Sequence, residues 1–233
     1  MVTTSDVRRL DYGYFVRPAE ETGTGQPRVE PVVGYLVRHS DGLLLFDTGV
    51  GVNDEVDQHY RITRRPVSDA LHAAGVAPRD VRLVINCHLH FDHCGGNPLF
   101  AGTPIVTQAT ELDTARTTED YTLPEVIDFP GVTYQQLDGE TELARDVWVI
   151  PTPGHTDGHQ SLVVRCTDGT VILAGQSHSS AADYTYDQLA WTAARTGDAK
   201  PLPPYPDWID RLHAFDPARV LFAHDLAVWE PAR

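Results

Sequence analysis

The stretch His88-Leu-His-Phe-Asp-His93 places three imidazoles and one carboxylate within six consecutive residues. The segment before it, Val81-Arg-Leu-Val-Ile-Asn-Cys87, is apolar and β-branched, and it predicts a buried strand that runs into His88. Side chains of an extended chain alternate between two faces, so His88 and His90 are expected to project to the same side. The Gly95-Gly96-Asn97 stretch permits a tight turn, which lets all four polar side chains converge.

Imidazole nitrogens and carboxylate oxygens are donors that zinc prefers, and they also suit manganese, iron or cobalt. The alternative is an exposed group of histidines at a strand end. Burying even one unpaired ionisable group is costly, so four adjacent ionisable groups are expected to share a binding partner. The hexapeptide therefore predicts a site for a divalent metal ion.

The composition limits the partners that the chain can bind. Its 233 residues, 41% of them hydrophobic, suffice for one compact domain over residues 1–233. The formal net charge of −15 argues against nucleic acid and against an anionic membrane as partners. No stretch approaches the length of a membrane span, no secretory signal is evident, and the three cysteines lack zinc-knuckle spacing, so a soluble, cytoplasmic protein is expected. The oligomeric state is left open.

Strand-like and helix-like segments alternate along the chain, which predicts a layered α/β sandwich. Residues 32–38 and 43–46 flank a Ser40-Asp-Gly42 turn and predict a hairpin, and the apolar spacing after Pro66 predicts a helix. The other expected elements are strands at 104–107, 148–150, 161–164, 171–174 and 220–223, and helices at 110–116, capped by Thr110, and around 186–194.

Two segments rich in proline and glycine, Pro18–Pro31 and Asp198–Asp207, are predicted to lack regular structure. The first is expected to be a surface connection. The second lies between two candidate site strands and carries Tyr205, with Trp208 just beyond it. We expect it to form a wall of the substrate pocket.

Other candidate site residues share the placement of the hexapeptide, since each comes after an apolar strand. His155 lies in a turn-rich segment, His224 follows the predicted strand 220–223, and Asp47 follows the predicted strand 43–46. A single histidine at a strand end is more often structural than a ligand. Several of them, together with a dense cluster, favour metal binding.

These motifs resemble those of the metallo-β-lactamase superfamily, and within it most those of the N-acyl-homoserine lactonases. They occur in the family's order along nearly the whole chain. The matching stretches are Leu45-Phe-Asp-Thr-Gly49, His88–His93 with Gly95-Gly96-Asn97, Thr152-Pro-Gly-His155 with Gly158-His-Gln-Ser-Leu162, and Phe222-Ala-His-Asp225. The resemblance implies an αββα sandwich with the metal site at one edge of its paired sheets.

The resemblance also implies a site for one or two zinc ions, with manganese, iron or cobalt as alternatives. Each ion would be bound by three side chains. These are His88, His90 and His155 for one ion, and Asp92, His93 and His224 for the second. Behind these ligands, Asp47 would orient a ligand histidine, and His159 would lie in a similar outer position.

One position departs from the family pattern. The family has an aspartate that bridges both ions after the strand 171–174, where this chain has Gln176. An amide oxygen can bind a cation, but it is neutral and bridges poorly, so the second ion is expected to bind more weakly. His178, two residues further on, could substitute as a ligand if the backbone stays extended, and a solvent-facing histidine is the alternative.

A second departure concerns the substrate carbonyl. The family's lactonases commonly place a tyrosine soon after the bridging aspartate to contact this carbonyl. Ser179 stands at the closest spacing here, so Tyr184 or Tyr186 would have to serve as the catalytic tyrosine.

The expected activity is hydrolysis of a small-molecule lactone, similar to an N-acyl-homoserine lactone, or of a related ester. A bound ion lowers the pKa of its water from about 15.7 to roughly 7, which makes hydroxide available, and it polarises the carbonyl. Asp92 would orient the water and pass its proton to the leaving alkoxide. Three alternatives stay open: a lyase, cyclase or isomerase acting on a secondary metabolite, a thioesterase, and a binding module without turnover.

Overall fold

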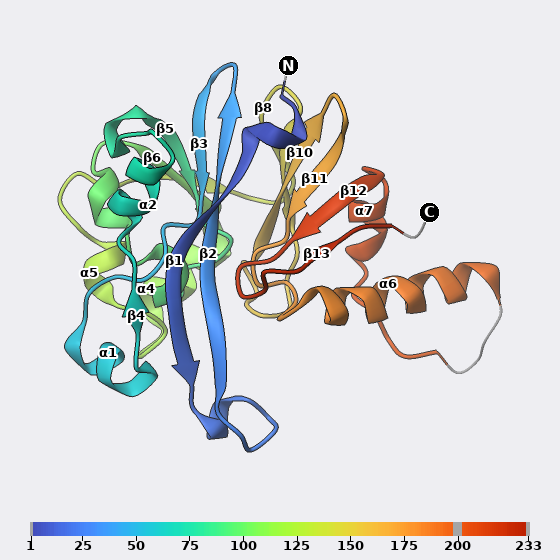
Figure 1. Ribbon diagram of the computed structural model, residues 1–233, viewed down its shortest axis with the longest axis horizontal. Coiled ribbons are helices and arrows are strands. Elements are labelled where there is room, and N and C mark those ends of the chain that lie inside the picture. The colour runs from blue at the N-terminus through green and yellow to red at the C-terminus, as the bar shows by residue number, and fades with distance from the viewer. Residues whose placement is uncertain (1, 198–201, 232–233) are drawn as a thin grey trace.

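The computed structural model describes residues 2–197 and 202–231, and it arranges them in four layers (Figure 1). Two β-sheets pack face to face, and helices lie on the outer side of each sheet. This αββα sandwich confirms the fold class expected from the sequence. Within the described residues, no helix is long and apolar enough to cross a membrane.

The first sheet has seven strands in the order β4-β1-β2-β3-β5-β6-β7. It begins with antiparallel strands and continues in parallel from β3 onwards. Its strands are Val7–Arg17 (β1), Arg28–His39 (β2), Gly42–Phe46 (β3), Thr63–Arg64 (β4), Val81–Ile85 (β5), Pro104–Gln108 (β6) and Thr133–Leu137 (β7).

The second sheet has six strands in the order β13-β12-β11-β10-β9-β8. Its neighbours are antiparallel except for β11 and β12, which run parallel. Its strands are Thr141–Ala144 (β8), Val147–Pro151 (β9), Gln160–Cys166 (β10), Gly169–Leu173 (β11), Pro217–Leu221 (β12) and Val228–Trp229 (β13).

The described residues form seven α-helices; Figure 1 shows α1, α2, α4 and α5 beside the first sheet and α6 and α7 beside the second. They are Asp54–Tyr60 (α1), Val67–Ala73 (α2), Phe91–Cys94 (α3), Ala109–Thr117 (α4) and Pro124–Ile127 (α5), followed by Ala181–Thr196 (α6) and Ile209–His213 (α7). Single 3₁₀ turns lie at Thr4–Asp6, Ala19–Glu21, Pro78–Asp80 and Asn97–Phe100.

Three of the four hydrophobic clusters among the described residues follow from this layering. One fills the space between the sheets, where Val37 of β2 and Val164 of β10 are fully buried. A second lies between the first sheet and its helices, and a third lies between the second sheet and α6 with α7. Both faces of the central strands are therefore buried, which explains apolar runs such as Val171–Leu173 that show no alternation.

The largest difference from the sequence-based expectation lies in β1 and the start of β2. Charged residues interrupt the apolar alternation of β1, so the pattern did not predict a strand, yet Leu10, Tyr12 and Phe15 are buried against the helices. β1 pairs with β2 along its length, with Arg17 opposite Arg28. The prediction of irregular structure through Pro31 is therefore wrong for its last four residues.

Glu30 holds this extension of β2 in place, and its side chain is almost fully buried. Its carboxylate accepts hydrogen bonds from Arg17 at 2.9 and 3.0 Å and from Arg28 at 2.7 Å. Burial alone would raise the pKa of Glu30, but the hydrogen bonds and charges, chiefly those of Arg17, together lower it. A buried carboxylate paired in this way fixes the backbone that leads into Pro31.

The other predicted elements are present, with shifted ends. β2 and β3 form the predicted hairpin, and α2 follows Pro66 as expected. The predicted helix cap is wrong: α4 begins at Ala109 with Gln108 as its N-cap, and Thr110 lies inside the helix. The reason is that β6 ends at Gln108 and α4 begins at the next residue, so Gln108 itself takes the N-cap position.

The two sheets are joined by backbone hydrogen bonds at one edge. Val33 donates to the carbonyl of Ala223 at 3.0 Å, and Gln160 donates to the carbonyl of Cys87 at 2.8 Å. The ends of β3, β5, β9, β11 and β12 lead into the loops that carry the candidate site residues. This edge of the sandwich is where those loops meet.

Candidate metal centre

The hexapeptide leaves the end of β5 and turns directly into α3, with His90 as the N-cap of that helix. The side-chain amide of Asn86 donates to the carbonyl of His93 at 3.1 Å and so holds the turn closed. Gly95 follows the helix, and a Cβ added there would lie 1.8 Å from the backbone nitrogen of Gly51. The turn therefore requires glycine at this position.

Three histidines converge on one side of this turn. Nε2 of His88 lies 3.0 Å from Nδ1 of His90, and Nε2 of His155 lies 3.1 Å from the same nitrogen. Two nitrogens bound to one zinc ion at 2.0–2.1 Å are about 3.3 Å apart in tetrahedral geometry. The spacing of these atoms fits a shared ion, and we name these residues the three-histidine cluster.

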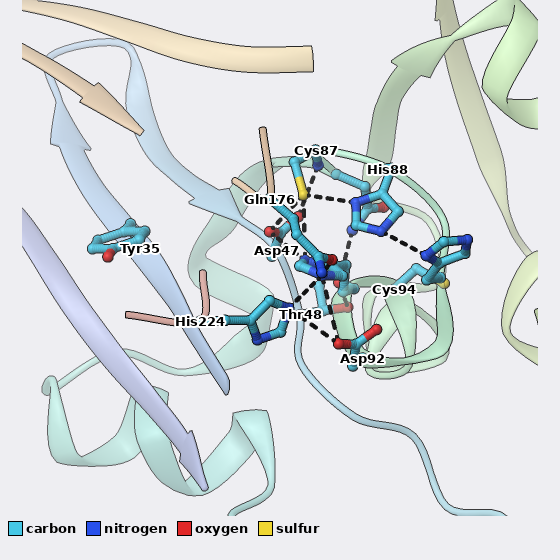
Figure 2. A network of polar contacts seen from close by, with 12 residues as sticks. Tyr35, Asp47, Thr48, Cys87, His88, Asp92, Cys94, Gln176 and His224 are labelled. Carbon is cyan, nitrogen blue, oxygen red and sulfur yellow. Dashed lines mark hydrogen bonds and ion pairs between the residues drawn. The ribbon is translucent and has the colours of Figure 1, made fainter. Parts of the chain in front are cut away.

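A second group of donors lies on the other side of the hexapeptide. Nε2 of His93 lies 3.1 Å from Nε2 of His224 and 3.1 Å from Oε1 of Gln176. Oδ2 of Asp92 lies 3.3 Å from the His224 nitrogen and 3.6 Å from the His93 nitrogen. Figure 2 shows the side chains of Asp92, Gln176 and His224 directed at a common point. Together with His93, these residues are named the Asp92 cluster.

Hydrogen bonds fix where the protons of this cluster lie. Nδ1 of His93 is 3.0 Å from Oδ2 of Asp47, and Nδ1 of His224 is 2.9 Å from the carbonyl oxygen of Pro31. Each oxygen accepts a hydrogen bond from Nδ1–H, so each ring in its neutral form presents its lone pair at Nε2. Two imidazole lone pairs then face the oxygens of Asp92 and Gln176, and a cation between them satisfies all four acceptors.

The environment keeps the three-histidine cluster unprotonated. Burial and neighbouring histidines lower the pKa of His88 well below its usual value. Burial lowers the pKa of His90 to about 4, and burial with His90 lowers that of His155 to about 3. These rings are therefore neutral at pH 7, which is the form that binds a metal ion.

The Asp92 cluster has the opposite electrostatics. Burial alone would raise the pKa of Asp92, but His93 and His224 lower it well below its usual range. Burial would lower the pKa of His93, but the carboxylates of Asp92 and Asp47 raise it to about 9. A positive charge is thus favoured at this point, and a divalent ion supplies it by replacing a proton.

The two residues expected behind the ligands, Asp47 and His159, each contact a candidate ligand residue. The carboxylate of Asp47 accepts hydrogen bonds from the backbone and thiol of Cys87 at 2.8 and 3.1 Å, in addition to its contact with His93. Nδ1 of His159 lies 3.1 Å from the carbonyl of Thr152, and its Nε2 accepts the backbone N–H of Gln176 at 3.1 Å. Both nitrogens of His159 therefore have partners, and the ring fixes the backbone at Gln176.

Glu111 of α4 is a buried site residue that the sequence did not reveal. Its carboxylate accepts the backbone N–H of Leu89 at 2.8 Å, the hydroxyl of Thr156 at 2.7 Å and the hydroxyl of Tyr121. Tyr121 in turn packs its ring 4.6 Å from that of His90. These partners are distant along the chain, so an acidic residue in a predicted helix gave no signal of the role.

The two candidate tyrosines lie elsewhere. Tyr184 of α6 is fully buried in the third hydrophobic cluster, with its ring 5.2 Å from Trp229. Tyr186 is 70% exposed, because two residues along a helix turn a side chain by about 200°. Among the described residues neither tyrosine has a hydrogen bond to a candidate ligand, so their placement does not support a role at the substrate carbonyl.

His178 also turns away from the clusters. Its Nε2 lies 3.0 Å from Oδ2 of Asp187 on α6, and its ring packs 5.5 Å from Trp208. Trp208 donates to the carbonyl of Pro153, two residues before His155, at 2.9 Å. Within the predicted pocket wall Asp198–Asp207, residues 198–201 lie outside the described residues.

A cleft of about 590 Å³ lies beside the hexapeptide. Phe91, which stands between His90 and Asp92, forms part of its wall and stacks on Tyr60 of α1 with ring centres 4.9 Å apart. Other lining residues include Val56, Tyr121 and Leu123. The cleft therefore combines these aromatic and aliphatic side chains with polar ones, among them Glu55, His59 and Asp120, beside the hexapeptide.

Comparisons with known proteins identify relatives of this chain. Residues 27–224 match the model of the metallo-beta-lactamase superfamily. An N-acyl homoserine lactonase from a Bacillus species is 37% identical over 157 residues, which are 61% of this chain and 62% of the relative. The chain thus matches less than two thirds of the length of that relative.

Solved structures extend the likeness across nearly the whole chain. The crystal structure of a quorum-quenching N-acyl homoserine lactone lactonase has a TM-score of 0.77 and 25% identity, covering 97% of this chain and 93% of the other. An N-acyl homoserine lactone hydrolase with N-hexanoyl-L-homoserine, its product, at the catalytic metal centre has a TM-score of 0.76 and 24% identity, covering 97% and 94%. At that identity the second likeness concerns the fold. The chain belongs to the metallo-β-lactamase superfamily.

Proposed function

We propose that the protein is a metal-dependent hydrolase that opens a lactone, with N-acyl-homoserine lactones as the substrate class. The observation that carries this proposal is the pair of donor clusters, which meet at a hexapeptide whose Phe91 also lines a cleft. The N-acyl homoserine lactonases matched by sequence and by fold support the choice of substrate class.

A divalent ion bound at this centre would supply a nucleophilic water at neutral pH and a Lewis acid for the carbonyl. We propose zinc as the ion, because imidazole and carboxylate donors suit it, with manganese, iron or cobalt as alternatives. The donor set fits such an ion, since the converging atoms are acceptors separated by 3.0 to 3.6 Å.

The chain's own residues would perform the remaining tasks. Asp92 keeps its negative charge in the site, so its carboxylate can orient a water molecule and pass a proton to the leaving alkoxide. The rings of Phe91 and Tyr60 would contact the acyl chain, because they line the cleft beside the candidate ligands. The described residues near the clusters offer Tyr121 as the adjacent tyrosine, but its hydroxyl is already bonded to Glu111.

The test is a panel of lactones, esters and thioesters assayed on protein with a measured metal content. We expect N-acyl-homoserine lactones to be hydrolysed, the activity to disappear on chelation, and zinc, manganese or cobalt to restore it. Replacement of His155 by alanine should abolish hydrolysis, whereas His72→Ala, at an exposed position on α2, should not change it. The proposal would be rejected if chelators left hydrolysis unchanged. It would also be rejected if metal-loaded protein did not hydrolyse N-acyl-homoserine lactones.

Gln176 favours a second candidate function. A neutral amide next to His93 leaves the metal centre with a single carboxylate among its candidate ligands. A lyase, cyclase or isomerase that uses an ion only as a Lewis acid needs no more than this. Turnover of a secondary metabolite without hydrolysis of any ester, thioester or lactone would favour that reading.

A further inference from the structure

The two clusters differ in the number of donors that the chain supplies. The Asp92 cluster offers four donor atoms, because Oε1 of Gln176 lies 3.1 Å from Nε2 of His93. The three-histidine cluster offers three. Four protein donors fill the tetrahedral shell that zinc prefers, whereas three leave one position for water or substrate.

The fold holds Gln176 at the Asp92 cluster. Its backbone N–H donates to His159 at 3.1 Å, and a Cβ added to the preceding Gly175 would lie 2.5 Å from the Cβ of Cys87. The backbone is therefore confined at Gly175 and at the N–H of Gln176. Among the hydrogen bonds of the described residues, Oε1 of Gln176 reaches His93 and no atom of the three-histidine cluster.

The two clusters also differ in solvent exposure and in charge, and both differences favour tighter retention of an ion by the Asp92 cluster. The side chains of the Asp92 cluster are at most 8% exposed, and one of them is a carboxylate that offsets part of the charge of an ion. In the three-histidine cluster His155 is exposed, His90 is half-buried, and every donor is an imidazole. An ion bound there is open to exchange with solvent.

We propose that the protein holds two metal ions unequally: the Asp92 cluster retains its ion, and the three-histidine cluster holds an exchangeable ion with a position free for an outside ligand. Gln176 is then a ligand of one ion and not a bridge between two. The proposal rests on the proposed function only in requiring a divalent metal centre. It reverses the order expected from the sequence, in which the ion beside Gln176 is the weaker one.

Metal release tests this order directly. Protein loaded with two equivalents of zinc is dialysed against increasing concentrations of chelator, and its metal content is measured by mass spectrometry. We expect two steps with a plateau at one ion per chain. Loss of both ions at the same chelator concentration would overturn the proposal.

Variants identify which cluster retains the ion. His155→Ala should begin at one ion per chain with unchanged retention. Gln176→Ala should lower the affinity for the retained ion at least about tenfold, and Gln136→Ala, at an exposed amide on β7, should not. Unchanged affinity in Gln176→Ala, or the loss of both ions in His155→Ala, would contradict the assignment.

Gln176→Glu is the second variant, because it keeps the length of the side chain if the alanine variant fails to fold. Its added charge should tighten the retained ion, and equal or weaker retention would overturn the assignment. Cobalt(II) absorption gives another readout. The absorption bands that appear with the first equivalent of cobalt should not change when acetate is added, whereas those of the second equivalent should shift. A shift in the first set would contradict a filled shell.

These measurements do not depend on turnover. Two-step release without lactone hydrolysis would reject the proposed function and leave this inference intact. Lactone hydrolysis with one-step release would reject the inference and leave the proposed function intact.

Discussion

The three-histidine cluster and the Asp92 cluster meet at one hexapeptide, but different buried carboxylates support them. Asp47 contacts an imidazole directly, since its Oδ2 lies 3.0 Å from Nδ1 of His93. Glu111 instead accepts hydrogen bonds from the backbone of Leu89 and the hydroxyl of Thr156, which are neighbours of the ligand histidines. One support therefore acts on the electronic state of a ligand, and the other acts on the positions of loops.

The largest expected effect comes from removing the carboxylate that belongs to the Asp92 cluster itself. Asp92→Asn keeps the shape but loses the charge and the proton acceptor, so kcat/KM for the lactone should fall by about 10³-fold. Asp113→Asn, at an exposed position on α4, is the matched control. Activity near that of the unmodified protein would show that Asp92 has no part in proton transfer.

Asp47→Asn should have the next largest effect and should act on one cluster only. Without the carboxylate, His93 is a weaker donor, and the affinity of the Asp92 cluster for zinc should fall by about 10- to 100-fold. Metal titration of each ion measures this. Asp41→Asn, in the exposed β2–β3 turn, serves as control, and an equal loss at both clusters would contradict the distinction between the supports.

Glu111→Gln should affect the other cluster. The single amide oxygen cannot accept all three hydrogen bonds, so the loops at Leu89 and Thr156 should loosen, and the three-histidine cluster should lose affinity about tenfold. Thr156→Val should act in the same direction, and Glu119→Gln, exposed, should have no effect. If Glu111→Gln lowered the zinc affinity of the Asp92 cluster instead, the assignment of Glu111 to the three-histidine cluster would be wrong.

The smallest effect concerns the strand end that positions His224 through Pro31. Glu30→Gln should lower the free energy of unfolding by only about 1 kcal/mol at pH 7, because Arg17 and Arg28 stay partly exposed to water. The pKa of Glu30 is lowered in the folded state, so its contribution is present above the ordinary value of 4.5 and is lost as the pH falls through the folded value.

Chemical unfolding of metal-free protein at pH 7 and at pH 3 measures this contribution without interference from metal release. The difference in stability between the unmodified protein and Glu30→Gln should shrink at the lower pH. A difference that grows as the pH falls would show that the carboxylate does not carry the effect.

Local patterns were enough to predict much of the fold. The hairpin of β2 and β3 and the helix after Pro66 depend on turn residues and apolar spacing within a few positions, and both are present. β1 was missed because exposed charges fall on both of its faces: Arg9 and Asp11 lie opposite the buried Leu10 and Tyr12, and Arg8 lies on the same face as those two. Which face is buried depends on helices that are distant in the sequence.

The sequence by itself determined the hexapeptide, the order of the later histidines, the neutral Gln176 and the α/β class, because each depends on residue type and short spacing. Only the tertiary structure decided that Gln176 contacts His93 across 83 residues and that the carbonyl of Pro31 accepts from His224 across 193. The same holds for the buried Tyr184 and for Glu111. The proton positions on the ligand histidines and the number of donors in each cluster depend on loops from distant strand ends. The packing of the two sheets brings these loops together.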